Sequence, residues 1–165
     1  MTESTLTPAK LWKSLSLAQR ERACRAFWTD DQATDDQMQA VFLIAQQKKF
    51  RPKSVLALDL DRRARHLASL AGLPDALIAR ALVVFHLQEQ RPMMGAFLDA
   101  LGIRHEDGLI EDDAVMPDAA KLGPAAASIW ASYPHADVSL YLRALLCQDP
   151  ATWGGLHGLP QLTEA

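Results

Sequence analysis

The sequence contains only two cysteines, Cys24 and Cys147, among 165 residues. Each lies in an apolar helical pattern, which indicates buried thiols in a reducing compartment rather than a disulfide framework, with a lone bridge between them as the alternative. No run of about 18 consecutive apolar residues is present, and Met1 to Lys10 lacks the basic start and apolar core of a signal peptide. We therefore expect a soluble, cytoplasmic protein that does not enter a membrane.

The motifs of common catalytic and cofactor sites are also missing. There is no glycine-rich phosphate loop, no serine between the glycines of a nucleophile elbow, and no basic cluster beside either cysteine. Five histidines are scattered singly; His86 and Glu89 have a metal-binding spacing, but no matching motif stands on a second helix. We therefore expect no metal, no cofactor and no catalytic residue, although a triad can assemble from distant positions.

Length and composition suit one domain. With 49% hydrophobic residues, the chain can bury a sizeable core. We expect a single helical domain over residues 1–165, with flexible ends at about 1–6 and 154–165.

Charge is distributed unevenly along the chain. Met1 to Arg91 holds 14 Lys/Arg against 10 Asp/Glu, whereas Pro92 to Ala165 holds 3 against 10, so the halves carry about +4 and −7. Such an asymmetry would orient a partner or another copy of the chain. The simpler interpretation, which we prefer from the sequence, is that sequence halves are not spatial halves.

Residues that typically start and stop helices predict three consecutive helices between Asp59 and Gly102. The middle one, Pro74 to Gln90, is apolar on every face, and Arg80 and His86 are its only polar side chains between Ala76 and Leu87. A helix that is apolar all round is buried all round, so we expect it to be the most buried helix of the domain. The residues that start and stop the three helices are Asp59, Gly72, Pro74, Pro92 and Gly102.

Capping signals predict further helices on both sides of this stretch. Ser16 with Gln19, and Thr34 with Gln37, have the spacing of a capping box. In the helix from Thr34, apolar spacing predicts an inner face of Met38, Val41, Phe42 and Ala45. Later signals are a start at Asp118, a break at Gly123-Pro124, a cap at Asp137 and a stop at Asp149-Pro150.

Two segments have no clear period. Residues 50–58 are interpreted as a connection or irregular helical turn that inserts leucines into the core. Ile103 to Met116 is interpreted as a solvated acidic loop. Together these patterns predict an all-α, single-domain bundle of seven to nine helices around the helix Pro74 to Gln90.

A helix-turn-helix signal lies in the central stretch. Its residues are Leu67-Ala68, Gly72-Leu73 and Ile78, whose spacing resembles that of the DNA-binding motif. Arg62, Arg63 and Arg65 would stand near phosphates, and Arg80 would be the one side chain able to read a base. A plain helical hairpin needs the same small residues for packing, and it is the interpretation we favour.

Basic residues gather in the same region. Seven of the 17 Lys/Arg occupy 18 positions: Lys48, Lys49, Arg51, Lys53, Arg62, Arg63 and Arg65. They would form an anion-binding or nucleic-acid patch with Phe50 as a stacking residue, or they are solvated helix ends and faces, which we prefer.

By elimination, the sequence favours a non-catalytic helical module that binds a protein partner or itself. Its contact surface would be the basic segment Lys48 to Arg65 or the acidic segment Glu106 to Asp113. The first alternative is a helix-turn-helix regulator, with nucleic acid as a disfavoured partner. The second is a ligand-binding or enzymatic domain with a pocket near Arg80, His86 and Glu89.

Overall fold

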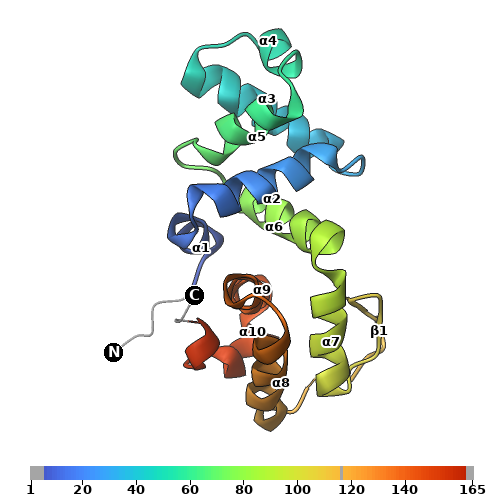
Figure 1. The fold of residues 1–165 in the computed structure, drawn as a ribbon. Helices are drawn as coiled ribbons and strands as arrows, with labels where there is room; N and C mark the ends of the chain where they lie inside the picture. Colours follow the sequence, from blue (N-terminus) through green and yellow to red (C-terminus); the bar gives the residue numbers. More distant parts are fainter. Residues whose placement is uncertain (1–5, 116, 163–165) are drawn as a thin grey trace. The chain divides into compact units, whose positions relative to one another are not determined.

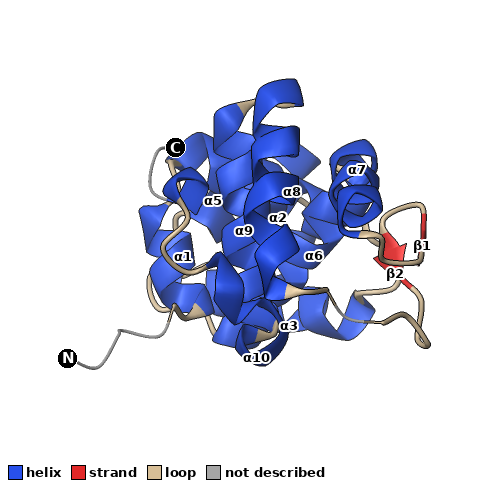
Figure 2. Ribbon diagram, turned by 90° about the horizontal axis from the view of Figure 1, so that it is seen from below, coloured by secondary structure: helices blue, strands red, loops and turns tan. Residues whose placement is uncertain are grey.

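The computed structural model describes residues 6–115 and 117–162. These residues form α-helices and one small hairpin, which confirms the predicted all-α class (Figure 2). The chain divides into two compact units: an N-terminal unit, Thr7–Gln88, and a C-terminal unit, Glu89–Ala165 together with Met1–Leu6 (Figure 1). No helix among the described residues has the length and apolar character needed to cross a membrane.

The N-terminal unit is built from six helices. They are α1 (Pro8–Ser14), α2 (Leu17–Thr29), α3 (Thr34–Lys48), α4 (Pro52–Leu56), α5 (Leu60–Ala68) and α6 (Asp75–Glu89), the last of which ends at the unit boundary. Helix α2 lies along α5, and α4 packs on α3 (Figure 1). The predicted caps at Ser16 and Asp59 are confirmed, because each side chain accepts a hydrogen bond from the backbone N–H three residues on.

Helix α6 is buried along most of its length, as its composition predicts. Leu77, Ile78, Leu82 and Phe85 are among its seven buried residues, whereas Ala76 and Ala79 are exposed near its start. Helix α9 (His135–Gln148) also buries seven residues, so α6 is not more buried than every other helix. Side chains from α2 hold α6 in place: Arg22 lies over the Phe85 ring, 5.1 Å from its centroid.

The C-terminal unit packs helices around an aromatic centre. Phe97 meets Tyr141 edge to face at 5.7 Å and Trp153 at 6.0 Å. The segment 154–162, which we expected to be a loose end, forms two short 3-10 turns and buries Leu156 completely. The rest of the expected flexible ends, residues 1–5 and 163–165, lies outside the described residues. The elements are α7 (Arg91–Leu101), β1 (His105–Glu106), β2 (Leu109–Ile110), α8 (Ala119–Ser132), α9, α10 (Pro150–Trp153), η1 (Gly154–Leu156) and η2 (Pro160–Leu162).

The number of helices exceeds the predicted seven to nine. The described residues contain ten α-helices, because Pro52–Leu56 and Pro150–Trp153 each form a helix of a single turn. The predicted break at Gly123-Pro124 is wrong: α8 runs through Pro124. Burial of Ala125, Ala126 and Ile129 against the rest of the unit outweighs the hydrogen bond that the proline removes.

Two predictions about α3 are also wrong. Ala33, not Thr34, is the N-cap, and an alanine has no side chain that could accept a cap bond. The Gln37 amide does not complete a capping box but donates to the carbonyls of Phe27 and Asp30. The inner face is Ala40, Val41, Ile44 and Ala45, while Phe42 is 56% exposed and Met38 is also exposed.

Residues 50–58 form an irregular helical turn, as predicted, but they do not insert leucines into the core. Val55 is the buried residue of α4, and Leu56 is 50% exposed.

Candidate interaction surface

The C-terminal end of α3 is fixed next to the α5–α6 turn by a glutamine. The Gln47 amide donates to the Ala71 carbonyl at 2.7 Å and accepts from the Ala71 N–H at 3.1 Å. Helix α3 then closes on Lys49, which adopts the left-handed conformation (φ 58°) that helices usually give to glycine. Lys48, Lys49 and Phe50 are therefore held beside the last turn of α5.

His66 of α5 is the centre of this arrangement. Its ring meets the Phe50 ring edge to face, with centroids 5.4 Å apart. Burial of the His66 ring lowers its pKa below the ordinary value. Three neighbouring cations lower that pKa further, in the order Lys48, Arg65, Arg62. The structure thus brings the ends of two helices together into one field of positive charge.

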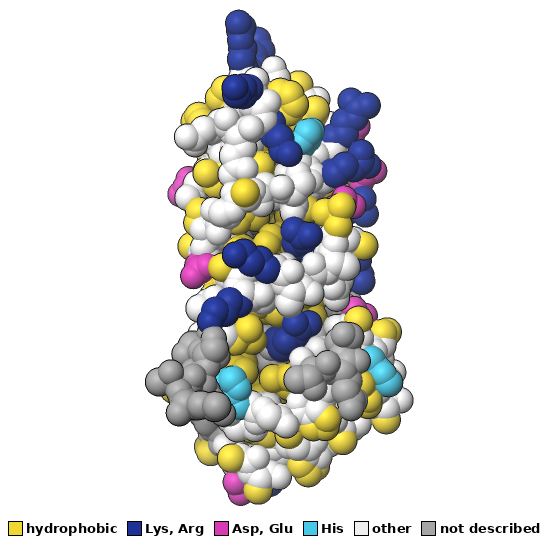
Figure 3. All heavy atoms as spheres, turned by 90° about the vertical axis from the view of Figure 1, so that its left-hand side faces the viewer, with side chains coloured by type: hydrophobic (Ala, Val, Ile, Leu, Met, Phe, Trp, Pro, Cys, Tyr) yellow, Lys and Arg dark blue, Asp and Glu magenta, His cyan; other side chains and the backbone are white. Residues whose placement is uncertain are grey.

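We define the cationic surface as the exposed basic residues of this region with the aromatic pair between them: Lys48, Lys49, Phe50, Arg51, Lys53, Arg62, Arg65 and His66. Among the described residues, no carboxylate lies within ion-pair distance of the lysines, Arg51 or Arg65. Arg62 pairs only with Asp59, one turn back, at 3.7 Å. The positive charge of the surface is therefore largely uncompensated. Figure 3 shows Lys and Arg side chains over one face of the N-terminal unit.

Apolar side chains are exposed on the same elements. Phe50 is 39% exposed, Leu56 of α4 is half-exposed, and Met38 and Phe42 are exposed on α3. Met38 and Phe42 are four residues apart, so they lie next to each other on one face of the helix. Large apolar side chains bordered by charge are typical of protein-binding surfaces.

The four arginines of the helix-turn-helix hypothesis do not gather on one surface. Arg80 forms an ion pair with Asp36 at 3.4 Å, at the N-terminal end of α3, and donates to the Gln32 carbonyl. Lys48 lies 12 residues further along α3, about 18 Å at 1.5 Å per residue. Arg80 therefore stands at the opposite end of α3 from the cationic surface.

Arg63 is also engaged elsewhere. Its guanidinium lies over the Trp28 ring, 5.4 Å from the centroid, and donates to the Leu58 carbonyl. The carboxylate that pairs with Arg80 is thus Asp36 of α3, which belongs to the same unit. The first turn of α3 therefore lies within reach of the long Arg80 side chain.

The candidate pocket residues are likewise dispersed around α6. His86 is buried, and the hydrogen bond between its Nδ1 and the Leu82 carbonyl (2.7 Å) directs the ring along its own helix. Arg80 points to α3 and Glu89 is exposed at the end of α6. The structure does not bring the Arg80 side chain to His86.

The acidic segment is a built hairpin rather than the solvated loop we expected. Strands β1 and β2 pair antiparallel, and Asp107 and Gly108 turn between them with φ of 51° and 91°, as a two-residue hairpin turn requires. The Asp-Gly dipeptide before Leu109-Ile110 is the sequence signal that we missed.

Three contacts fasten this hairpin to α7. His105 Nε2 bonds to Asp99 at 2.7 Å, and its Nδ1 accepts the Gly108 N–H. Arg91 reaches both the carbonyl and the carboxylate of Asp107. Gly108 lies so close to α7 that an added Cβ would stand 2.9 Å from the Met94 Cβ. The hairpin is therefore a rigid projection of the C-terminal unit.

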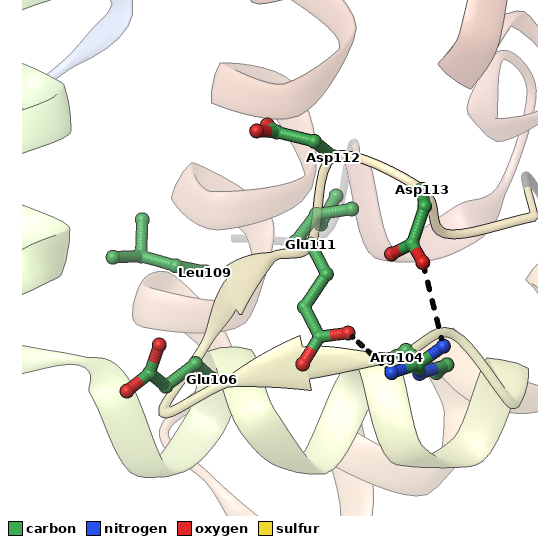
Figure 4. A pocket seen from close by; sticks show the side chains of 7 residues that line it. Arg104, Glu106, Leu109, Glu111, Asp112 and Asp113 are labelled. Carbon is green, nitrogen blue, oxygen red and sulfur yellow. Dashed lines mark ion pairs between the residues drawn. The ribbon is translucent and has the colours of Figure 1, made fainter.

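Three of the five carboxylates between Glu106 and Asp113 are paired with arginines: Asp107 of the turn with Arg91, and Glu111 and Asp113 with Arg104. Arg104 forms ion pairs with Glu111 (3.0 Å) and Asp113 (3.6 Å), as Figure 4 shows. Glu106 and Leu109 lie toward the turn, and the Glu106 carboxylate has no ion-pair partner among the described residues (Figure 4). An open depression is lined by residues of both groups.

His66 is the functional candidate that sequence reasoning overlooked, because histidines were treated as scattered. Its position four residues after Arg62, on the same helix face, was the available signal.

Within residues 6–115 and 117–162, no three His, Cys, Asp or Glu side chains gather as metal ligands would. Comparison of the chain with protein-family models, curated proteins and solved structures finds no match.

Proposed function

We propose that this chain is a non-catalytic helical interaction module whose cationic surface binds an acidic segment of a protein partner. The observation that carries the proposal is the uncompensated charge around the Phe50–His66 pair. Among the described residues, none offers a carboxylate that pairs with Lys48 or Arg65. The electrostatic attraction for an external anion is therefore strongest there.

A protein partner suits this surface better than a nucleic acid. Bases stack on aromatic rings, but Leu56 offers aliphatic area that only another apolar side chain would bury well. The dispersal of Arg63 and Arg80 also removes two of the four cations that a duplex would need. The expected partner therefore presents carboxylates together with apolar residues, as an acidic amphipathic helix does.

Cys24 and Cys147 are thiols rather than the two halves of a disulfide, which supports a reducing, cytoplasmic location as part of this proposal. Cys24 is buried, and its burial raises the pKa of its thiol, which makes it unreactive rather than catalytic.

The test is fluorescence anisotropy of the full chain with three labelled probes: an amphipathic peptide with Glu on one helix face and Leu on the other, a poly-Glu peptide of equal charge, and a random DNA duplex. At about 0.15 M salt, we expect the amphipathic peptide to bind tightest. Lys48→Gln combined with Arg65→Gln should weaken it by about tenfold or more.

Lys13→Gln is the matched control for Lys48→Gln alone, because each removes one charge and Lys13 is an exposed cation of the same unit that does not contribute to the field at His66. If Lys13→Gln weakened peptide binding as much as Lys48→Gln, the loss of affinity would come from net charge alone. Sequence-selective duplex binding abolished by Arg80→Ala would instead establish the regulator.

A further inference from the structure

The charge asymmetry of the sequence is an asymmetry between the two units. The N-terminal unit, Thr7–Gln88, holds 13 Lys/Arg against 8 Asp/Glu, a formal charge of +5. Residues 89–165 hold 4 against 11, a formal charge of −7. Our preferred interpretation of the sequence, that its halves are not spatial halves, is therefore wrong. One molecule carries both members of a complementary pair.

The acidic hairpin presents a carboxylate beside an apolar side chain, which is the combination expected of a partner of the cationic surface. Glu106 and Leu109 are directly opposite each other in the strand register, so their side chains leave the same face of the hairpin. The neighbouring pair contains His105, whose ring turns to Asp99 of α7, so Glu106 and Leu109 face away from that helix. Leu109 is 47% exposed.

The hairpin also suits docking because little has to be ordered when it binds. Its turn, its register and its attachment to α7 are already fixed by Gly108, His105 and Arg91. A carboxylate and an apolar side chain held side by side match a lysine or arginine beside Phe50. Preorganisation lowers the entropic cost that a flexible acidic tail would carry.

We propose that the occupant of the cationic surface is the acidic hairpin of a second copy of this chain. Asp112, which follows β2, lines the same open depression as Glu106 and Leu109. Glu106 and Asp112 would face Lys48 and Arg65, with Leu109 against Phe50. This inference rests on the function proposed above. Because the two surfaces differ, the contact is head-to-tail, and it closes into a ring or continues as a filament according to its rotation.

Paired charge reversals test this directly. Variant A carries Lys48→Glu and Arg65→Glu, so acidic residues stand on both sides of the proposed contact pairs. Variant B carries Glu106→Lys and Asp112→Lys, so basic residues stand on both sides of the same pairs. Each variant alone should repel itself, whereas a mixture of A and B restores opposite charges at every contact.

Sedimentation velocity of the full chain gives the readout. At about 0.01 M salt, where the Debye length is about 30 Å, the unmodified chain should show a sedimentation coefficient that rises with concentration. The rise should disappear at about 1 M salt. Variants A and B should each remain monomeric, and their equimolar mixture should associate again.

Circular dichroism checks that each variant is folded. A variant that does not fold is replaced by its neutral form, which is Lys48→Gln with Arg65→Gln for variant A and Glu106→Gln with Asp112→Asn for variant B. The neutral form should associate at least about tenfold more weakly than the unmodified chain. A chain that stays monomeric at low salt, or a mixture that does not associate, overturns the second-copy inference. If such a monomer still binds the acidic amphipathic peptide, the proposed function stands and the occupant is another protein. If it does not bind the peptide, both fail.

Discussion

Two alanine substitutions in α3 decide whether its buried face is the one in the structure. The apolar pattern of the sequence placed Phe42 inside, whereas the structure exposes 56% of Phe42 and none of Ile44, two residues away. Phe42→Ala therefore removes less than half of the burial of a phenylalanine, whose full value is about 1.5–3 kcal/mol. We expect it to lower the free energy of unfolding by about 1 kcal/mol or less.

Ile44→Ala, by contrast, creates a cavity at a fully buried position and should cost about 2–5 kcal/mol. Both variants place alanine in the same helix, so helix propensity changes in the same direction and largely cancels in the comparison. The assay is urea unfolding followed by circular dichroism, with the denaturant slope compared between variants. A cost above about 2 kcal/mol for Phe42→Ala, with little effect of Ile44→Ala, would refute the assigned core of the N-terminal unit.

Three further outcomes follow from the structure. Leu82→Ala, in the buried part of α6, should cost about 2–5 kcal/mol in urea melts; a cost below about 1 kcal/mol would mean that this side chain does not support the core. Gly108→Ala should destabilise the chain, because φ is +91° and the new Cβ meets Met94, whereas Gly154→Ala, with no atom within 4 Å, should not; equal thermal midpoints would contradict this. The pKa of His66 is lower in the folded protein than in the unfolded chain, so the unfolded chain binds the proton more tightly. The contribution of His66 to the free energy of unfolding is therefore present above about pH 6.5 and is lost as the pH falls through the folded-state pKa. Lys48→Gln should raise that pKa in an NMR titration, and Lys13→Gln should leave it unchanged.

The fold was readable from the sequence wherever a local signal and the tertiary packing agree. Asp59 and Gly102 act as predicted because a cap bond or a left-handed residue needs only its own neighbours. Pro124 does not end its helix, because the residues that follow it are buried against the rest of the unit. Gln37 does not complete a capping box, because its amide bonds to the carbonyls of Phe27 and Asp30 outside its own helix. The apolar periodicity predicted the helix α3 but placed its buried face incorrectly around the helix axis. Phe42 and Ile44 are both apolar, and only packing decides which of them is buried.

The candidate site was harder to predict than the fold. The basic residues were visible as a run, but their convergence depends on Gln47 holding the α5–α6 turn to the end of α3. No spacing rule reports such a contact. The separation of Arg80 from Arg62 likewise depends on tertiary packing, because Arg80 of α6 contacts the first turn of α3 and Arg62 of α5 lies near its last turn.

Screening decides which part of the charge asymmetry can act in recognition. At physiological ionic strength the Debye length is about 8 Å, which is shorter than either unit, so formal charges of +5 and −7 do not act as wholes. They accelerate encounter at low salt, while affinity at physiological salt depends on charges brought within a few ångströms of a partner. Lys48 and Arg65 satisfy that condition because they already act together on His66. Neutralising Lys48 alone should therefore weaken binding far more than neutralising Lys13, although the two substitutions change the net charge equally.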